Sequence, residues 1–360
     1  MAEPANSRNL VNGELIVLAR EYRGKTAAEL AEELGVHKSL ISKIENSWRP
    51  ASDELLANLS RVLNLPVSFF TRPERVYPSN LHWRKRVTAG PRYVRAAEAE
   101  MNVHRLAIER MLKSVDVHAK PLPAMDVEEH GSPRIVAKTV RQLWNVPRGP
   151  INELFALIEK SGIIIVPCDF ESGIDGRSMY TKDRLPIIFV DRNSPTDRQR
   201  LTVAHELGHL IMHTNFPVSE ERDVEKEAMA FASELLMPQD QLRPQLERPI
   251  RMDVLADLKR YWRVSMAAIL YRAKEEKLIT PTNLKRMWME FSRLGLKKRE
   301  PLELDPPAES PILIKWLVEA HQQELDMTLE AIAEMCGLGV AELRDKYVEQ
   351  GKKKHLLYSR

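Results

Sequence analysis

Residues 203–213 have the sequence VAHELGHLIMH, which indicates both the local structure and the chemistry of the central part of the chain. It places His205 and His209 four residues apart among apolar side chains. On an α-helix, residues four apart lie on one face, about one turn from each other. Two imidazoles at this spacing can reach one tetrahedral zinc ion through bonds of about 2.0–2.1 Å. The stretch therefore predicts a buried metal-binding helix over residues 195–213; the alternative is a pair of hydrogen-bonded core histidines.

Glu206 stands beside the two histidines and is the candidate general base. A zinc ion lowers the pKa of a bound water to about 7, so a neighbouring carboxylate can accept its proton. A catalytic zinc site usually has three protein ligands and one open position, so a third ligand must come from elsewhere. His213 does not fit, because at about 1.5 Å of rise per residue it lies about 12 Å along the helix from His205.

The third ligand is expected from the next predicted helix, over residues 221–236. Ala228 and Ala232 follow Glu225 by three and seven residues, so these positions share one face that lets two helices approach closely. Glu227 faces about 200° away and is the less favoured ligand, although a shift in helix phase would exchange the two. The alternative for either carboxylate is a solvated charge on the helix surface.

Two short apolar runs, residues 162–166 and 185–190, are rich in β-branched side chains and bounded by Gly, Pro and Asp. Such runs are typical of buried strands, and Asp175-Gly176 between them predicts a turn. Ser194 is the expected N-cap of the histidine helix, with Pro195 at its first position. The central part is therefore predicted as α+β. Further helices are expected over residues 94–117, 133–144, 251–297 and 311–349.

Residues 26–45 have the sequence TAAELAEELGVHKSLISKIE, which indicates a helix, a turn at Gly35 and a second helix. They lie within residues 13–70, where apolar residues recur at helical spacing in five short blocks. A short second helix of this kind fits a DNA major groove, so the pattern predicts a five-helix DNA-binding domain; the alternative is a protein-interaction module. The polar side of the second helix carries Lys38, Ser39, Ser42 and Lys43.

The composition is that of an ordinary folded chain. The 360 residues are 43% hydrophobic and 29% charged, which excludes collagen-like, low-complexity and grossly disordered classes and fits two or three domains. A net charge of +3 means that any DNA-binding face is local. Two cysteines exclude a disulfide framework and favour a reducing compartment. Because no signal peptide or membrane-spanning apolar run is found, we expect a cytoplasmic protein without membrane contact.

The central residues resemble the ImmA/IrrE metallopeptidase family over about 135–280. The resemblance implies a zincin-like α+β domain and a zinc peptidase that acts on a regulatory protein. It also implies Zn²⁺ ligands at His205, His209 and Glu225, with Glu206 as general base. Family members usually carry Asn or Asp where this chain has Met229, which cannot orient a metal-bound histidine, so zinc affinity or activity is expected to be weaker. The matching stretches are residues 148–151, 174–176, 189–191, 200–209 and 225–238.

Residues 12–72 resemble the XRE family of lambda-repressor-like helix-turn-helix domains. The resemblance implies that Lys38, Ser39 and Ser42 approach base edges, whereas Lys43 and Arg49 contact phosphate. Three residues depart from the usual pattern: Ala27 replaces a Gln, His37 replaces a Ser cap, and Ser47 replaces a Gly. Basic residues between 72 and 95 are expected to add the charge that duplex binding requires.

The sequence thus predicts a multidomain chain: an all-α helix-turn-helix domain (12–72), a basic linker (73–95), an α+β zincin-like metallopeptidase domain (96–280) and a helical C-terminal region (281–360). The expected function is a transcriptional regulator that binds a double-stranded DNA operator and cleaves a partner repressor or antitoxin. The alternatives are a non-proteolytic regulator whose zinc domain senses a ligand or partner, and an antitoxin that binds a toxin. A homodimer is expected, because readers of this type often bind paired half-sites.

Overall fold

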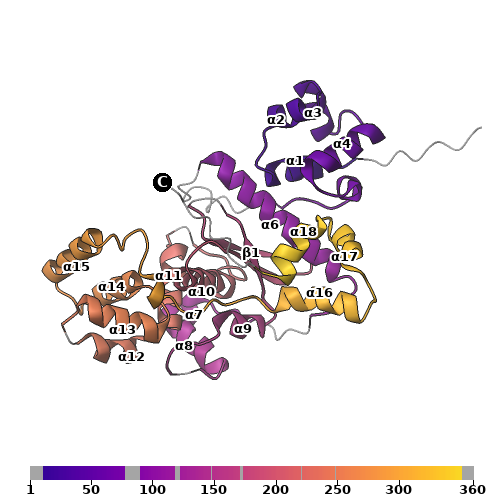
Figure 1. Cartoon of the computed structure of the whole chain (residues 1–360). Coiled ribbons are helices and arrows are strands. Elements are labelled where there is room, and N and C mark those ends of the chain that lie inside the picture. Colours follow the sequence, from indigo (N-terminus) through magenta and orange to yellow (C-terminus); the bar gives the residue numbers. More distant parts are fainter. Residues whose placement is uncertain are drawn as a thin grey trace, which may run out of the picture.

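The computed structural model describes most of the chain, and the predicted regions are recognisable in it (Figure 1). An N-terminal helical region is followed by a central region with a small sheet and by further helices. Among the residues described, no helix is long and apolar enough to span a membrane. The described residues are 11–77, 90–117, 122–146, 148–170, 173–219, 221–247 and 249–350.

The N-terminal region is a bundle of short helices, as predicted, and its last element is a 3₁₀ turn. Thr26 and Glu29 form a capping box, in which each side chain accepts a hydrogen bond from the other residue's backbone N–H. Arg20 and Glu45 form an ion pair of 2.6 Å that ties the first helix to the third. The elements are α1 (Gly13–Tyr22), α2 (Ala27–Glu33), α3 (Lys38–Glu45), α4 (Asp53–Leu63) and η1 (Val67–Thr71).

His37 and Ser47, which depart from the usual helix-turn-helix pattern, have the backbone conformations expected of the Ser and Gly that they replace. The Nδ1 atom of His37 accepts a hydrogen bond of 3.2 Å from the backbone N–H of Ser39, so His37 caps α3 as a serine would. Ser47 has a φ of 58°, in the left-handed region that favours glycine and that costs another residue about 1–2 kcal/mol. The helix-turn-helix geometry is therefore preserved at both positions.

The sheet has three strands in the order β1-β3-β2. β1 (Ile164–Cys168) and β3 (Pro186–Asp191) are parallel and buried throughout, so the two predicted strands are confirmed with shifts of one or two residues. β2 (Gly176–Tyr180) pairs antiparallel with β3. Nothing in the sequence pattern predicts β2, because its residues are largely polar and only half-buried. The predicted turn at Asp175-Gly176 is in fact where this strand begins.

Gly176 is required where β2 begins. A Cβ atom at this position would lie 2.6 Å from the carbonyl oxygen of Phe189 and 2.5 Å from the side chain of Thr202. Neither neighbour can move freely, because one is backbone of the central strand and the other belongs to the histidine helix. The glycine therefore allows the edge strand to lie close to that helix.

The two faces of the sheet bury different hydrophobic cores. Ile165 and Ile188, paired in register, belong to the core that contains the histidine helix. Their neighbours Ile164 and Ile187, also in register, belong to the core that is shared with the N-terminal bundle. Burial on both faces explains why β1 and β3 are continuous apolar runs rather than alternating ones.

The histidine helix is α10 (Thr196–Met212), and the helix after it is α11 (Val224–Leu236), close to the predicted ranges. The predicted cap was wrong. The hydroxyl of Ser194 donates to Asp191 at 2.7 Å, and Pro195 is the N-cap residue instead. The remaining helices of this region are α7 (Val127–His130), α8 (Pro133–Leu143), α9 (Leu154–Glu159), α12 (Gln239–Leu246), α13 (Met252–Trp262), α14 (Met266–Glu275) and α15 (Pro281–Arg293).

The C-terminal helices do not form one separate unit. α15 contributes Met287 and Phe291 to the core of the histidine helix, whereas α16 and α17 share the other core with α1, α6 and the sheet (Figure 1). The domain boundaries at 95/96 and 280/281 therefore stay a prediction. Residues 328–338, which include α17, are packed against α6, with Ile332 and Cys336 fully buried. The bounds are α6 (Pro91–Met111), η2 (Leu302–Leu304), α16 (Leu313–Gln323), α17 (Leu329–Cys336), α18 (Val340–Leu343) and the π-helical turn η3 (Arg344–Val348).

The predicted basic linker over residues 73–95 is described only in part. Residues 78–89 lie outside the described residues, and residues 91–95 form the start of α6 rather than a linker. Three arginines among the basic residues between 72 and 95 contact other parts of the protein. Arg72 donates to the carbonyls of Glu334 and Met335, Arg92 contacts Glu29, and Arg95 contacts Glu21.

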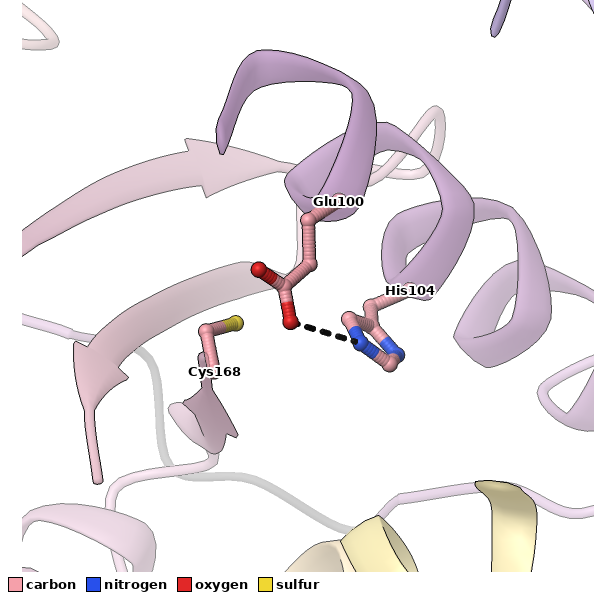
Figure 2. A group of neighbouring side chains, drawn as sticks. All are labelled: Glu100, His104 and Cys168. Atoms are coloured by element: carbon pink, nitrogen blue, oxygen red, sulfur yellow. Dashed lines mark ion pairs between the residues drawn. The ribbon is translucent and has the colours of Figure 1, made fainter. Parts of the chain in front are cut away.

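A buried polar cluster joins η3 to α6 and to the end of β1 (Figure 2). Glu100 and His104 lie one turn apart on α6 and point toward Cys168. The ammonium group of Lys346 donates to Glu100 and lies 3.2 Å from Asp169. Burial alone would raise the pKa of Glu100, but Lys346 and His104 hold it at about 2. This ion pair fixes the C-terminal turn to the centre of the molecule.

Breaking this buried ion pair from one side is expected to destabilise the protein strongly. Lys346→Met leaves the Glu100 carboxylate buried with no ammonium partner, so the free energy of unfolding should fall by about 3–5 kcal/mol. The exposed pair of Lys315 and Glu319 is the control, and Lys315→Met should cost less than about 1 kcal/mol. Adding Glu100→Gln to Lys346→Met should recover part of the loss in urea unfolding. Equal losses in the single and double variants would contradict this account.

The low pKa of Glu100 also predicts a pH dependence of stability. In the unfolded chain this carboxyl has its ordinary pKa near 4.5, whereas in the folded protein the pKa is about 2. The unfolded state therefore binds the proton first as the pH falls, and a stabilisation of order 3 kcal/mol, present above pH 4.5, is lost toward pH 2. The slope of unfolding free energy against pH in this window should be smaller in Glu100→Gln. Parallel curves for the two proteins would refute the prediction.

Candidate metal centre

The candidate metal centre lies where α10 and α11 come into close contact. Gly208 of α10 faces Ala228 of α11, and a Cβ atom on Gly208 would lie 3.3 Å from the Cα of Ala228. Ala228 and Ala232 are fully buried, which confirms the small-residue face predicted for α11. Because both facing positions are so small, side chains one turn away on the two helices can converge on one point.

Three predicted ligands converge there. The Nε2 atoms of His205 and His209 lie 3.1 Å apart, and the carboxylate of Glu225 lies 3.2 Å from the first and 3.6 Å from the second. Ligand atoms around a tetrahedral ion with bonds of about 2.0–2.1 Å are separated by about 3.3–3.4 Å. The three side chains therefore have donor types that a metal ion accepts, at separations close to those of a tetrahedral site.

The structure separates the two acidic candidates that the sequence left open. Glu225 contacts both histidines, which holds the pKa of its carboxyl well below the ordinary value. Glu227 points to His213 and to Arg222, at 2.9 and 2.7 Å. Glu225 thus has the geometry of the third ligand, and Glu227 has a different partner.

Glu206 lies beside this group and is held by the edge strand. Its side chain is 4% exposed, and one carboxylate oxygen accepts a hydrogen bond of 2.7 Å from the hydroxyl of Ser178 on β2. Burial alone would raise the pKa of Glu206, but the charges of Arg177 and the histidines, together with this hydrogen bond, keep it below the ordinary value. Glu206 is therefore an ionised carboxylate that can accept a proton.

A cavity of about 540 Å³ opens along β2 at this site. Its wall includes residues 177–182 of the edge strand and its turn, together with His209 and His213 of the histidine helix. An edge strand offers unpaired backbone N–H and C=O groups, which an extended peptide can bind. The space beside the three ligands is thus suited to a polypeptide segment.

The described residues contain one other group with metal-binding atoms, namely Glu100, His104 and Cys168 (Figure 2). The Lys346 ammonium already donates to Glu100. Burial holds the pKa of the Cys168 thiol well above its ordinary value, so the thiol is not a ready ligand. This group is therefore explained as a structural ion pair rather than a metal centre.

The predicted DNA-contacting residues belong to α3 and to the loop that follows it. Lys38, Ser39, Lys43 and Arg49 are exposed and Ser42 is half-buried. Within the part of the chain that the structure describes, none of the three cations in this set forms an ion pair, so their charge is available to a phosphate. The hydroxyl of Ser39 lies 2.8 Å from the Nδ1 atom of His37, which ties it to the cap of α3.

The sequence pattern did not indicate the contacts that two further residues make at the metal centre. Ser178 was missed because the strand that carries it has no apolar pattern. His213 was excluded as a ligand, and its nitrogen atoms do lie outside the group formed by His205, His209 and Glu225, but its contact with His209 was not foreseen. Its spacing of four residues from His209 is the signal that could have indicated that contact.

Two segments of the chain match known families. Residues 158–274 match the IrrE N-terminal-like domain of a peptidase family, and residues 16–70 match a helix-turn-helix family. No curated protein matches the chain significantly. The first segment contains His205, Glu206, His209 and Glu225, and the second contains all of α3. Both resemblances are thus confirmed: the chain joins an N-terminal XRE-type helix-turn-helix segment to a central segment of the IrrE/ImmA-like metallopeptidase family.

Proposed function

We propose that the chain is a DNA-binding regulator whose central domain is a zinc peptidase that cleaves a partner regulatory protein, a repressor or an antitoxin. The observation that carries the proposal is the convergence of His205, His209 and Glu225 within 3.1–3.6 Å of one another. The donor set of two imidazoles and one carboxylate is a common one for catalytic zinc. The peptidase family match supports the same chemistry.

In this proposal, different residues of the chain have different roles in peptide hydrolysis. A bound Zn²⁺ would supply acidified water and polarise the scissile carbonyl. Ser178 holds one oxygen of Glu206, and we assign proton acceptance to the other oxygen. The edge strand β2 would hold the substrate backbone in an extended conformation, and the apolar packing of α10 would keep bulk water from Glu206.

The helix-turn-helix segment would place this activity on DNA. In our proposal, Lys38, Ser39 and Ser42 approach base edges in the major groove, while Lys43 and Arg49 contact phosphate. Regulators that are bound at an operator are then within reach of the peptidase. A dimer would match paired half-sites, as is common for this kind of reader.

Metal analysis of the purified chain tests the ligand assignment. The protein should hold about one zinc ion per chain, and His205→Ala and Glu225→Gln should each lose most of it because two ligands bind zinc weakly. His130→Ala, which changes a histidine on α7, is the matched control and should keep the ion. Equal zinc content in His205→Ala and the unaltered chain would remove the metal centre.

Glu206→Gln tests whether proteolysis is the output. The amide keeps the size of the side chain but cannot accept the proton, so zinc and DNA binding should be retained while cleavage falls by about 10²–10⁴-fold. The measurement is the amount of intact partner protein in cells that carry either form. Normal regulation by Glu206→Gln would instead favour a non-proteolytic regulator whose zinc domain senses a ligand or partner.

The phosphate contacts can be tested with a random-sequence DNA duplex. Lys43→Gln and Arg49→Gln should each weaken binding and reduce the slope of log K against log salt by about 0.9, because one phosphate contact is lost in each. Lys285→Gln removes the same charge from α15, which lies far from α3 in Figure 1, and should change neither quantity. Identical salt slopes for all the proteins would reject the assignment of α3 to DNA.

A further inference from the structure

We infer that His213 and Glu227 are positioning residues that orient His209 for metal binding through a chain of hydrogen bonds. This inference rests on the metal centre proposed above. The Nδ1 atom of His209 lies 3.0 Å from Nδ1 of His213, and Nε2 of His213 lies 2.9 Å from the carboxylate of Glu227. Arg222 holds that carboxylate by two hydrogen bonds, of 3.0 and 2.7 Å.

Only one placement of hydrogen on the rings of His209 and His213 satisfies these contacts and also leaves Nε2 of His209 free to bind a metal ion. Nε2 of His209 is the atom that faces His205 and Glu225, so it must be free of hydrogen to bind a cation. A neutral His209 then carries its hydrogen on Nδ1 and donates it to Nδ1 of His213. A neutral His213 in turn carries its hydrogen on Nε2 and donates it to Glu227.

The reversed placement fails at two points. If His213 donated from Nδ1, a neutral His209 would carry its hydrogen on Nε2 and could no longer act as a ligand. A neutral His213 would then also present the lone pair of its Nε2 to the Glu227 carboxylate, which is repulsive at 2.9 Å. The Glu227 carboxylate, held in place by Arg222, therefore selects the tautomer of His209 through His213.

The fold explains why this chain of contacts exists here. His213 is the C-cap residue of α10, one turn beyond His209, and its side chain is only 7% exposed. Its ring is tilted by 58° to the ring of His209, with centroids 5.1 Å apart. Arg222 lies in the connection to α11 and also approaches Asp126, at 3.5 Å, so the outer end of the chain is anchored on a second element.

The two histidine ligands are not equivalent in this respect. The Nδ1 atom of His205 is buried and has no hydrogen-bond partner among the residues that the structure describes. On the side of the ring away from the metal centre, His205 is therefore held by packing alone, whereas His209 has a hydrogen-bond partner in His213. Loss of the His213 acceptor should loosen the one imidazole whose Nδ1 atom is held by a hydrogen bond.

A matched pair of substitutions tests the role of His213. Asn and Leu have nearly the same shape, and the Asn amide oxygen is separated from Cα by the same number of bonds as Nδ1 of histidine. His213→Asn therefore keeps an acceptor for His209, whereas His213→Leu removes it. Both remove the ring Nε2 that reaches Glu227, because the Asn amide nitrogen lies one bond closer to Cα. The probe is zinc alone, measured by competition with a chromophoric chelator.

The zinc dissociation constant should rise about 10–100-fold in His213→Leu and by less than about 3-fold in His213→Asn. Adding Glu227→Leu to His213→Leu should cause no further rise, because Glu227 acts through His213. Equal effects of Asn and Leu would show a merely structural role and overturn the inference. So would an unchanged dissociation constant in His213→Leu. Binding of the same DNA duplex by each variant checks that the fold is intact.

A second readout does not depend on zinc. Long-range ¹H–¹⁵N spectra of the metal-free protein report which ring nitrogen of each histidine carries hydrogen. We expect hydrogen on Nδ1 of His209 and on Nε2 of His213; an Nδ1 atom of His209 without hydrogen would overturn the inference. If the unaltered chain shows these tautomers but binds no zinc, the metal centre fails while the hydrogen-bond chain stands, so the two failures can be told apart.

Discussion

The close contact between α10 and α11 is the constraint on which the rest of the central region depends. Glu206, the proposed general base, and two imidazoles lie on one helix, and the Glu225 carboxylate lies on the next, so the four groups converge only if the two backbones nearly touch. Gly208 and Ala228 reduce the facing side chains to a hydrogen atom and a methyl group. The same contact brings Glu227 to His213, which lies within hydrogen-bonding distance of His209. One small-residue interface therefore places both the ligands and their support.

The sequence predicts the elements that are defined by apolar periodicity. β1, β3, α10 and α11 were found because each buries a continuous or helical pattern of apolar side chains. β2 was missed, and Ser178 with it, because a polar edge strand forms through pairing with its neighbour and leaves no such pattern. The predicted cap at Ser194 was wrong: its hydroxyl donates to Asp191, three residues earlier, and Pro195 occupies the N-cap position. The exact end of a helix is the part of an element that sequence patterns fix least well.

The candidate site likewise contains residues that the sequence could place and residues that only the packing of two helices could place. The two histidines and Glu206 could be placed from their spacing, because one helix fixes their relation. The choice between Glu225 and Glu227 depends on how α11 is rotated against α10, and no spacing within one helix contains that information. His213 is a case in which spacing within one helix did contain the information. Its distance from His205 along the helix axis excluded it as a ligand, but it lies one turn from His209 and contacts that residue.

The core that α6, α16 and α17 share with the N-terminal bundle has a mechanical consequence. Side chains of α1 are buried together with those of the sheet, and Tyr22 and Arg23 at the end of α1 contact Glu342 of α18. The N-terminal bundle, which carries α3, is thus packed against the body of the protein rather than joined to it by the connection between residues 77 and 90 alone. Packed side chains therefore set the distance between α3 and the candidate metal centre. Under the proposed function, a bound operator would lie at a constant separation from the peptidase site.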